Sequence, residues 1–277
     1  MTILLGLIAA ISVAGAQLQS TSSRVVLVST TVSGRALVDL GVDDFVVEED
    51  GKSREILDVH IADYPLVVLL DNAAADIDAV RDAAIRFVSK VGERGVAVGT
   101  LAEPSGLIAT FDDDRARVLA AIRDAPAAPA ARLAPSDALA TAARMLKESG
   151  APFSAIVVIS ARPLAPTELG PADLLTPVLG SGTAVHVVAR RPGVSEPDPS
   201  AQGAPDLFRE LANVSHGQYT TIYSAASYAI ALDRLADRLA AEMMIQYLSP
   251  PGGSAGGEVR VGVKIPGAKV TGLGVSR

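Results

Sequence analysis

The stretch "PLVVLLDNAAADIDAVRDAAIRF", residues 65–87, contains an apolar strand, one aspartate and the start of a helix in direct succession. Every side chain of residues 66–70 is apolar, as expected for a parallel strand that is covered on both faces. From Ile77 onward, apolar residues recur at helical spacing, at Val80 and Phe87. The stretch therefore predicts a strand and a crossover helix, which together form the repeating unit of a parallel α/β sheet.

The same alternation continues along the chain. Further strands are expected at 95–102, 106–111, 154–160, 183–190 and 217–223, and helices at 112–125, 136–149, 171–182, 206–215 and 225–244. In the last helix, the side chains expected to face the protein body are Ile230, Leu232, Leu235, Leu239 and Met243. This order predicts an open, doubly wound, mostly parallel sheet of Rossmann-like type, with helices on both faces.

Segments of β character flank this α/β domain, which we expect to span residues 64–244. Residues 24–63 are rich in β-branched side chains, and Asp50-Gly51 is a strong signal for a hairpin turn. Residues 245–277 return to a β pattern. Because neither segment has a parallel sheet to join, we expect them to pair with each other in a small flanking β module.

Composition excludes several classes of function. The net charge is −7 at pH 7, and the sequence has no extended cluster of lysine and arginine. Nucleic acids and anionic membrane surfaces need an array of basic side chains, so neither is an expected partner. The absence of cysteine excludes disulfides, thiolate zinc sites and cysteine nucleophiles.

The first 16 residues predict a secretory signal peptide. A short apolar run ends in Ala14-Gly15-Ala16, a small-x-small pattern that places cleavage after Ala16. Only Met1-Thr2 precedes the run, so the usual positive charge is missing, and a buried strand or helix is the alternative. We expect a periplasmic or secreted protein that meets the membrane only through this signal peptide.

Ligand sites in open α/β sheets lie at the carboxyl ends of the strands. There the sequence places Asp71 and Asn72 after 66–70, Ser136 at the start of a helix as its N-cap, and Arg162 after 154–160. These four residues are the candidate binding residues. The loops expected to carry binding are 71–75, 103–106, 126–136 and 161–167, or else 191–205.

Asp71 has two interpretations. It is one pole of a polar or protein-binding surface, or it is a helix cap or turn former, or half of an ion pair with Arg162. Aspartate is common in turns and caps because its carboxylate accepts hydrogen bonds from nearby backbone N–H groups.

No catalytic residue is predicted. The three histidines, His60, His186 and His216, have no nucleophile motif beside them. The sequence also contains no Gly-x-Ser-x-Gly elbow and no phosphate-binding glycine loop between a strand and a helix.

The order of elements resembles a von Willebrand factor A domain, in the form found in a family of secreted bacterial proteins. The segments "LGVDDFVVEEDGKSREI" (40–56) and "LADRLAAEMMIQYLSP" (235–250) resemble the flanks of the domain in that family. The resemblance covers residues 24–277. It implies a metal-ion-dependent adhesion site, formed by an Asp-x-Ser-x-Ser loop, a threonine and a second aspartate.

Position by position, this sequence keeps only the first of those ligands. Asp71 matches the first aspartate, whereas Ala73 and Ala75 replace the two serines. The threonine position falls near Leu133, where Ser136 is the nearby hydroxyl, and the second aspartate position is Ala161. Because one carboxylate cannot hold Mg²⁺ against its hydration shell, we expect no metal and no cofactor.

These observations predict a non-enzymatic, exported protein with an adhesion-like or scaffold-like role. Its expected partner is another protein in the cell envelope or the extracellular space. Two alternatives remain open: a hydrolase whose site the sequence does not show, and a purely structural envelope component.

Overall fold

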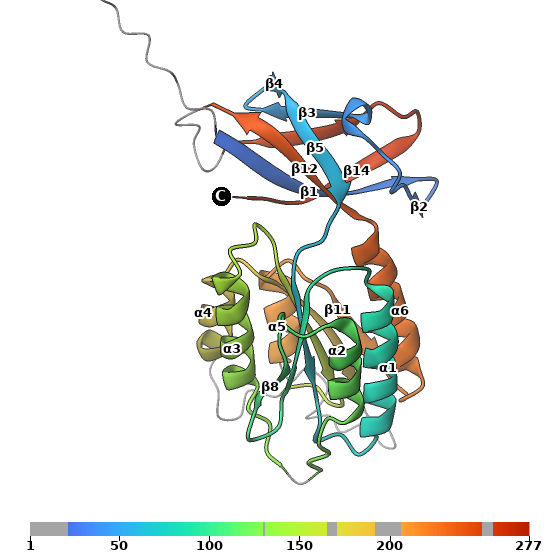
Figure 1. Cartoon of the computed structure of the whole chain (residues 1–277), viewed down its shortest axis with the longest axis vertical. Coiled ribbons are helices and arrows are strands. Elements are labelled where there is room, and N and C mark those ends of the chain that lie inside the picture. The colour runs from blue at the N-terminus through green and yellow to red at the C-terminus, as the bar shows by residue number, and fades with distance from the viewer. Residues whose placement is uncertain (1–21, 130, 165–170, 192–205, 251–256, 277) are drawn as a thin grey trace, which may run out of the picture.

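The computed structural model describes residues 22–129, 131–164, 171–191, 206–250 and 257–276. It contains an α/β part and a β part that are stacked along the long axis of the molecule (Figure 1). The expected signal peptide, residues 1–16, lies outside the described residues, as does most of the loop 191–205. None of the described helices is long and apolar enough to cross a membrane.

The α/β part is built on a six-stranded sheet in the order β11-β10-β9-β6-β7-β8. Its strands are β6 (Leu66–Leu70), β7 (Val96–Thr100), β8 (Gly106–Ala109), β9 (Ala155–Ser160), β10 (Ala184–Arg190) and β11 (Tyr219–Ile222). All neighbours pair in parallel except β7 and β8, which are antiparallel. The predicted mostly parallel α/β sheet is therefore confirmed.

Helices cover both faces of this sheet, as Figure 1 shows. They are α1 (Ile77–Lys90), α2 (Arg115–Arg123), α3 (Pro135–Glu148), α4 (Pro171–Leu179), α5 (Leu207–Val214) and α6 (Ser227–Ala240). Alternate side chains of β6 enter the two layers: Leu66 and Val68 pack with α1, α2 and α6, whereas Val67 and Leu69 pack with α3 and α5. This double burial explains why β6 is apolar throughout.

Three details of the expected helices are wrong. Ser136 is not the N-cap of α3, because the helix begins at Pro135 and Ala134 occupies the cap position. Proline suits the first helical position, where no backbone N–H is needed. The last helix ends at Ala240, so Met243 belongs to a strand, and Ile230 is 57% exposed instead of facing the body.

The β part joins segments from the two ends of the described chain. A first sheet has the order β14-β1-β12-β5, with a short strand β2 on β1, and a second has the order β13-β3-β4. Their bounds are β1 (Ser22–Val32), β2 (Arg35–Ala36), β3 (Phe45–Glu49), β4 (Lys52–Arg54), β5 (Ile56–Ile61), β12 (Glu242–Ser249), β13 (Val259–Val263) and β14 (Ala268–Val275), with a 3-10 turn at Val42–Asp44. β1 lies between β12 and β14 and is antiparallel to both.

The hairpin predicted at Asp50-Gly51 is confirmed. These two residues connect β3 to β4, and their φ angles are +52° and +72°. A two-residue hairpin with positive φ at both positions matches the right-handed twist of the strands. Glycine at the second position takes that conformation without strain.

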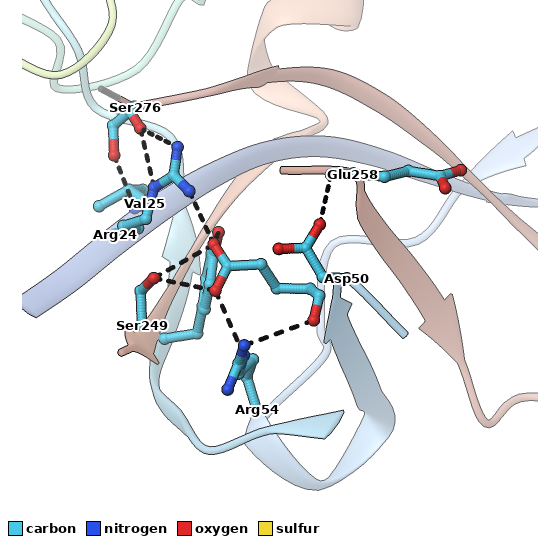
Figure 2. A network of polar contacts seen from close by, with 9 residues as sticks. Arg24, Val25, Asp50, Arg54, Ser249, Glu258 and Ser276 are labelled. Atoms are coloured by element: carbon cyan, nitrogen blue, oxygen red, sulfur yellow. Dashed lines mark hydrogen bonds and ion pairs between the residues drawn. The ribbon is translucent and has the colours of Figure 1, made fainter. Parts of the chain in front are cut away.

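The two sheets of the β part are joined by the buried carboxylate of Glu49. Its Oε1 accepts a hydrogen bond from Arg24 Nη1 at 2.7 Å, and its Oε2 accepts one from the Ser249 hydroxyl at 2.9 Å. Arg54 Nε lies 3.2 Å from Oε2. Figure 2 shows Arg24, Arg54 and Ser249 converging from different strands.

Electrostatics favour the ionised form of Glu49. Burial by itself raises the pKa of this carboxyl, but the hydrogen bonds from Ser249 and Arg24 and the charges of Arg24 and Arg54 outweigh burial. The pKa is therefore lowered from its ordinary value. A carboxyl of this kind contributes stability above its ordinary pKa and loses that contribution as the pH falls.

We expect Glu49→Ala to lower the free energy of unfolding by about 3 kcal/mol at neutral pH, because it leaves two part-buried arginines without their carboxylate. Glu48→Ala is the matched control, since Glu48 lies next to it on β3 with its side chain exposed. Urea unfolding followed by circular dichroism measures both. Equal losses in the two variants would show that the cluster does not join the sheets.

Candidate functional site

The strand order places a switch point between β6 and β9. The chain leaves β6 through α1 to β7 on one side, while β9 lies on the other side. In open α/β sheets the carboxyl ends of two such strands border the ligand crevice. We call this end of the sheet the carboxyl face; its described residues are 71–76, 101–105, 126–129, 131–134, 161–164 and 223–226. It lies at the end of the α/β part away from the β part (Figure 1).

Asp71 is fully buried at the centre of the carboxyl face. Its Oδ1 accepts a hydrogen bond from the backbone N–H of Ala73 at 3.2 Å. Its Oδ2 accepts one from the N–H of Ala161 at 3.0 Å and one from the Ser160 hydroxyl at 3.4 Å. The carboxylate thus closes the turn after β6 and joins it to the loop after β9.

Asn72 has a comparable role toward other loops. Its side-chain N–H donates to the carbonyl of Pro126 at 3.0 Å, and its Oδ1 accepts from the N–H of Ala102 at 3.0 Å. Its own carbonyl accepts from the N–H of Ala128 at 2.8 Å. Asn72 is nearly completely buried, so it holds the loops after β7 and before α3 and does not present its side chain to a partner.

The other two candidate residues differ in position and exposure. Arg162 is on the surface, with 51% of its side chain exposed, and its Nε lies 4.0 Å from Asp71 Oδ2. An ion pair this long and this solvated contributes little. Ser136 lies in the first turn of α3, and its hydroxyl is buried with no hydrogen-bond partner among the described residues. The structure therefore brings Asp71 and Arg162 together but does not connect Ser136 to either.

The sequence did not indicate a role at this site for two further residues, Ser160 and Tyr228. Ser160 ends β9, and its hydroxyl donates to the carbonyl of Arg162 at 2.7 Å as well as contacting Asp71. Tyr228, buried at the start of α6, donates to the carbonyl of Ser160 at 2.9 Å. Burial is the main cause that raises the pKa of Tyr228, so its hydroxyl stays protonated and serves as a donor.

The residues of the carboxyl face do not fit a Mg²⁺ site. The Asp71 oxygens already accept three hydrogen bonds, and methyl groups stand at Ala73, Ala75 and Ala161. Leu133, at the threonine position, forms a β-bridge with Ala102. No cluster of three or more His, Asp or Glu side chains that could hold a metal occurs in the described part of the chain. Mg²⁺ needs a nearly octahedral set of oxygen ligands, which these residues do not supply.

The histidines lie apart from the carboxyl face and from one another. His60 Nδ1 lies 2.8 Å from Asp58 Oδ2 on the exposed strand β5, and His216 is exposed at a φ of +59°. His186 is buried in β10, where its Nδ1 accepts a hydrogen bond from the N–H of Gln218 at 3.1 Å. Within the described ranges, no hydrogen bond joins a histidine to a serine hydroxyl, which is the contact a serine nucleophile and its base would need.

His186 is held neutral by its surroundings. Burial is the largest cause, and the positive charges of Arg238 and Arg94 add to it, lowering the pKa to about 3. Because Nδ1 accepts a hydrogen bond, the ring hydrogen is on Nε2.

No protein-family model matches the chain, and no curated protein is similar to it in sequence. Solved structures are similar in fold. A von Willebrand factor type A protein from Catenulispora acidiphila aligns over 93% of this chain and 74% of its own, at 15% identity and a TM-score of 0.52. Proximal thread matrix protein 1 from the mussel byssus aligns over 65% of this chain at 12% identity and a TM-score of 0.51. This alignment spans 48% of the byssus protein's length.

The similarity to the Catenulispora protein extends beyond the six-stranded sheet, because it includes most of the chain. The α/β part therefore has a von Willebrand factor A-like fold. At this level of identity the similarity shows the fold and leaves the activity to be argued from the residues.

We expect Mg²⁺ and Mn²⁺ to give no saturable heat in isothermal titration calorimetry with this protein, because no three carboxylate or imidazole side chains of the described residues come together to hold a metal. We expect Asp71→Ala to lower the free energy of unfolding by about 2–3 kcal/mol, since the backbone N–H groups of Ala73 and Ala161 lose their acceptor. The control is Asp82→Ala, which removes an exposed carboxylate from α1. Saturable metal binding that Asp71→Ala abolishes would contradict this assignment.

Between pH 6.5 and about 3 the unfolded chain binds a proton at His186 that the folded chain does not bind. Stability from this residue is therefore complete above pH 6.5 and falls as the pH decreases, by at most about 1.4 kcal/mol per pH unit. We expect His186→Asn to reduce the loss of unfolding free energy measured by urea titration between about pH 7 and about pH 5. An unchanged pH dependence in this variant would refute the buried, neutral state of His186.

Proposed function

We propose that this chain, whose α/β part has a von Willebrand factor A-like fold, is a non-enzymatic protein-interaction protein that acts without a metal. Its interaction surface is the carboxyl face. The observation that carries the proposal is the use of Asp71 and Asn72 as internal hydrogen-bonding residues, which makes this end of the sheet a fixed surface instead of a metal centre.

A fixed surface suits protein recognition. Asp71 connects the loops after β6 and β9, and Asn72 connects the loops after β7 and before α3. Loops that are held in one conformation lose less conformational entropy when a partner binds. The hydrogen bonds of these two side chains therefore favour binding through the outer residues of the same loops.

Those outer residues include types that are common in interfaces. Tyr223 directly follows β11 and is 69% exposed, and Arg162 extends from the loop after β9. Tyrosine and arginine are enriched among residues that dominate binding energy, because each combines a large contact area with hydrogen bonding. In a metal-free site, such side chains take the place of a metal bridged to a partner's carboxylate.

Contacts of the described histidines favour binding over hydrolysis. His60 is paired with Asp58, His186 is buried and neutral, and His216 is exposed at a turn. General base catalysis needs a titrating group within reach of a nucleophile, and these contacts do not provide one.

The proposal includes export. Residues 1–16 have the pattern of a signal peptide, and the absence of cysteine is compatible with either side of the envelope. In this proposal the strands at both ends of the described chain form a flanking module, which carries the α/β part, and the partner is a protein of the envelope or the extracellular space.

Capture from an envelope extract of the source organism, with the purified chain immobilised, tests the interaction surface. We expect Arg162→Glu and Tyr223→Ala each to reduce recovery of a captured partner by about tenfold, since exposed anchors of these types often contribute more than 1 kcal/mol. Arg260→Glu and Leu57→Ala are the matched controls, because both residues are exposed in the β part.

Equal recovery by the wild type and both carboxyl-face variants would show that the partner binds elsewhere. Loss of recovery in the controls as well would assign the effect to general surface charge or folding. Circular dichroism of each variant separates a folding defect from an effect of surface charge.

A further inference from the structure

A cavity of about 780 Å³ lies at the other end of the α/β part, between it and the β part. Strands β1 and β14 form one wall, and the segments that precede β9 and β10 form the other. The cavity is at the amino ends of the parallel strands, whereas Asp71 is at their carboxyl ends. Its volume is in the range of pockets that enclose small organic ligands.

One side of this cavity is apolar. Val25 and Leu27 of β1 and Leu273 of β14 line it, and the ring of Phe153, from the segment before β9, lies against β14 at Gly274. Such a wall gains free energy by covering the hydrocarbon part of a ligand, because the apolar surface leaves water. The apolar wall therefore favours a ligand with a hydrophobic body.

The ionisable residues that line the cavity are Tyr64, His186, His216, Arg238 and Glu242, and two of them, Arg238 and His186, have buried or part-buried groups available to a ligand. Arg238 donates from Nη1 to Gln218 Oε1 at 2.9 Å, and no carboxylate lies within 4.0 Å of it among the described residues. His186 is only 3% exposed, and its Nε2–H has no hydrogen-bond partner in the described part of the chain. Because His186 lines the cavity, this N–H is free to donate to a ligand there.

Glu242, which also lines the cavity, is already paired. Its Oε2 accepts a hydrogen bond from the Tyr64 hydroxyl at 2.5 Å, and Arg94 Nη2 lies 4.0 Å away. The guanidinium of Arg94 in turn stacks on the Tyr64 ring, with its Cζ 4.2 Å from the ring centroid. Among the described residues, Arg238 is therefore the cation of this wall with no carboxylate within 4.0 Å. The Glu242 charge acts on it from a longer distance, which leaves the guanidinium able to pair directly with a ligand's carboxylate.

We propose that this cavity binds a small molecule with an apolar body and a single carboxylate, with the carboxylate on Arg238 and the Nε2–H of His186. Arginine and a neutral imidazole N–H are both donors, and a carboxylate accepts from both. A phosphate with two negative charges is a poorer match, because one arginine would have to balance it beside the Glu242 carboxylate. This inference does not depend on the proposed function of the carboxyl face.

Isothermal titration calorimetry with octanoate tests the proposal on the full chain. We expect saturable binding of one octanoate. We expect octan-1-ol, which has the same tail and no charge, to bind about tenfold more weakly or worse, since hydrogen bonds to a charged group are the stronger kind. Octylamine, with the opposite charge beside Arg238, should give no saturable heat, and octyl phosphate should bind more weakly than octanoate.

Arg238→Gln should weaken octanoate binding by about tenfold or more, whereas Arg234→Gln should leave it unchanged. Arg234 is the matched control because it is exposed on the same helix, α6. Ala151 lines the cavity, so Ala151→Trp fills part of the cavity and leaves Arg238 in place. This variant should also lose octanoate binding, and it tests the proposal if Arg238→Gln does not fold.

Three results would overturn the proposal. One is no saturable heat with octanoate in the wild type. Another is equal affinity for octanoate and octan-1-ol, which would leave the charged wall without a role. The last is an equal loss in the Arg234→Gln and Arg238→Gln variants, which would indicate a general charge effect.

Discussion

The hydrogen bonds of the Asp71 carboxylate are the constraint on which the carboxyl face depends. A parallel strand that ends at the switch point leaves backbone N–H groups with no ladder partner, and buried N–H groups need acceptors. The methyl side chains of Ala73 and Ala75 are not acceptors. The Asp71 carboxylate accepts from the backbone N–H groups of Ala73 and Ala161. The aspartate thus has a structural role in this turn, and its presence alone does not indicate a metal.

The amino end of the same sheet is organised by a different buried group, Glu242. Burial raises the pKa of this carboxyl, against the hydrogen bond from Tyr64 and the nearby charges of Arg94 and Arg238. Its backbone carbonyl also accepts from the N–H of Ala62, so the two segments that connect the α/β part to the β part are fastened to each other. Both connections are fixed at one place. The cavity lies between the sheet that contains β1 and β14 and the amino ends of β9 and β10.

The extent to which the sequence predicts this structure depends on how local each signal is. The apolar run of β6, the crossover helices and the Asp50-Gly51 hairpin follow from neighbouring residues, and the structure has them. The antiparallel direction of β8 and the true start of α3 could not be predicted, because pairing and packing decide them. At the candidate site, Asp71 was identifiable from its position after a buried strand. The role of Ser160 was not, since its contact with Asp71 joins residues 89 positions apart.

The two ends of the sheet are connected by β10 in a way that favours independent binding. His186 of this strand lines the cavity, whereas Arg190 at its other end forms an ion pair with Asp76 on the carboxyl face at 3.0 Å. One route from the cavity to that ion pair is a shift of β10 along its axis. Such a shift would break the parallel ladders to β9 and β11 together, because both pair with β10 in a single register. Coupling between distant sites requires an element with two arrangements of similar free energy. A strand that is paired in one register on both sides offers a single arrangement along this route.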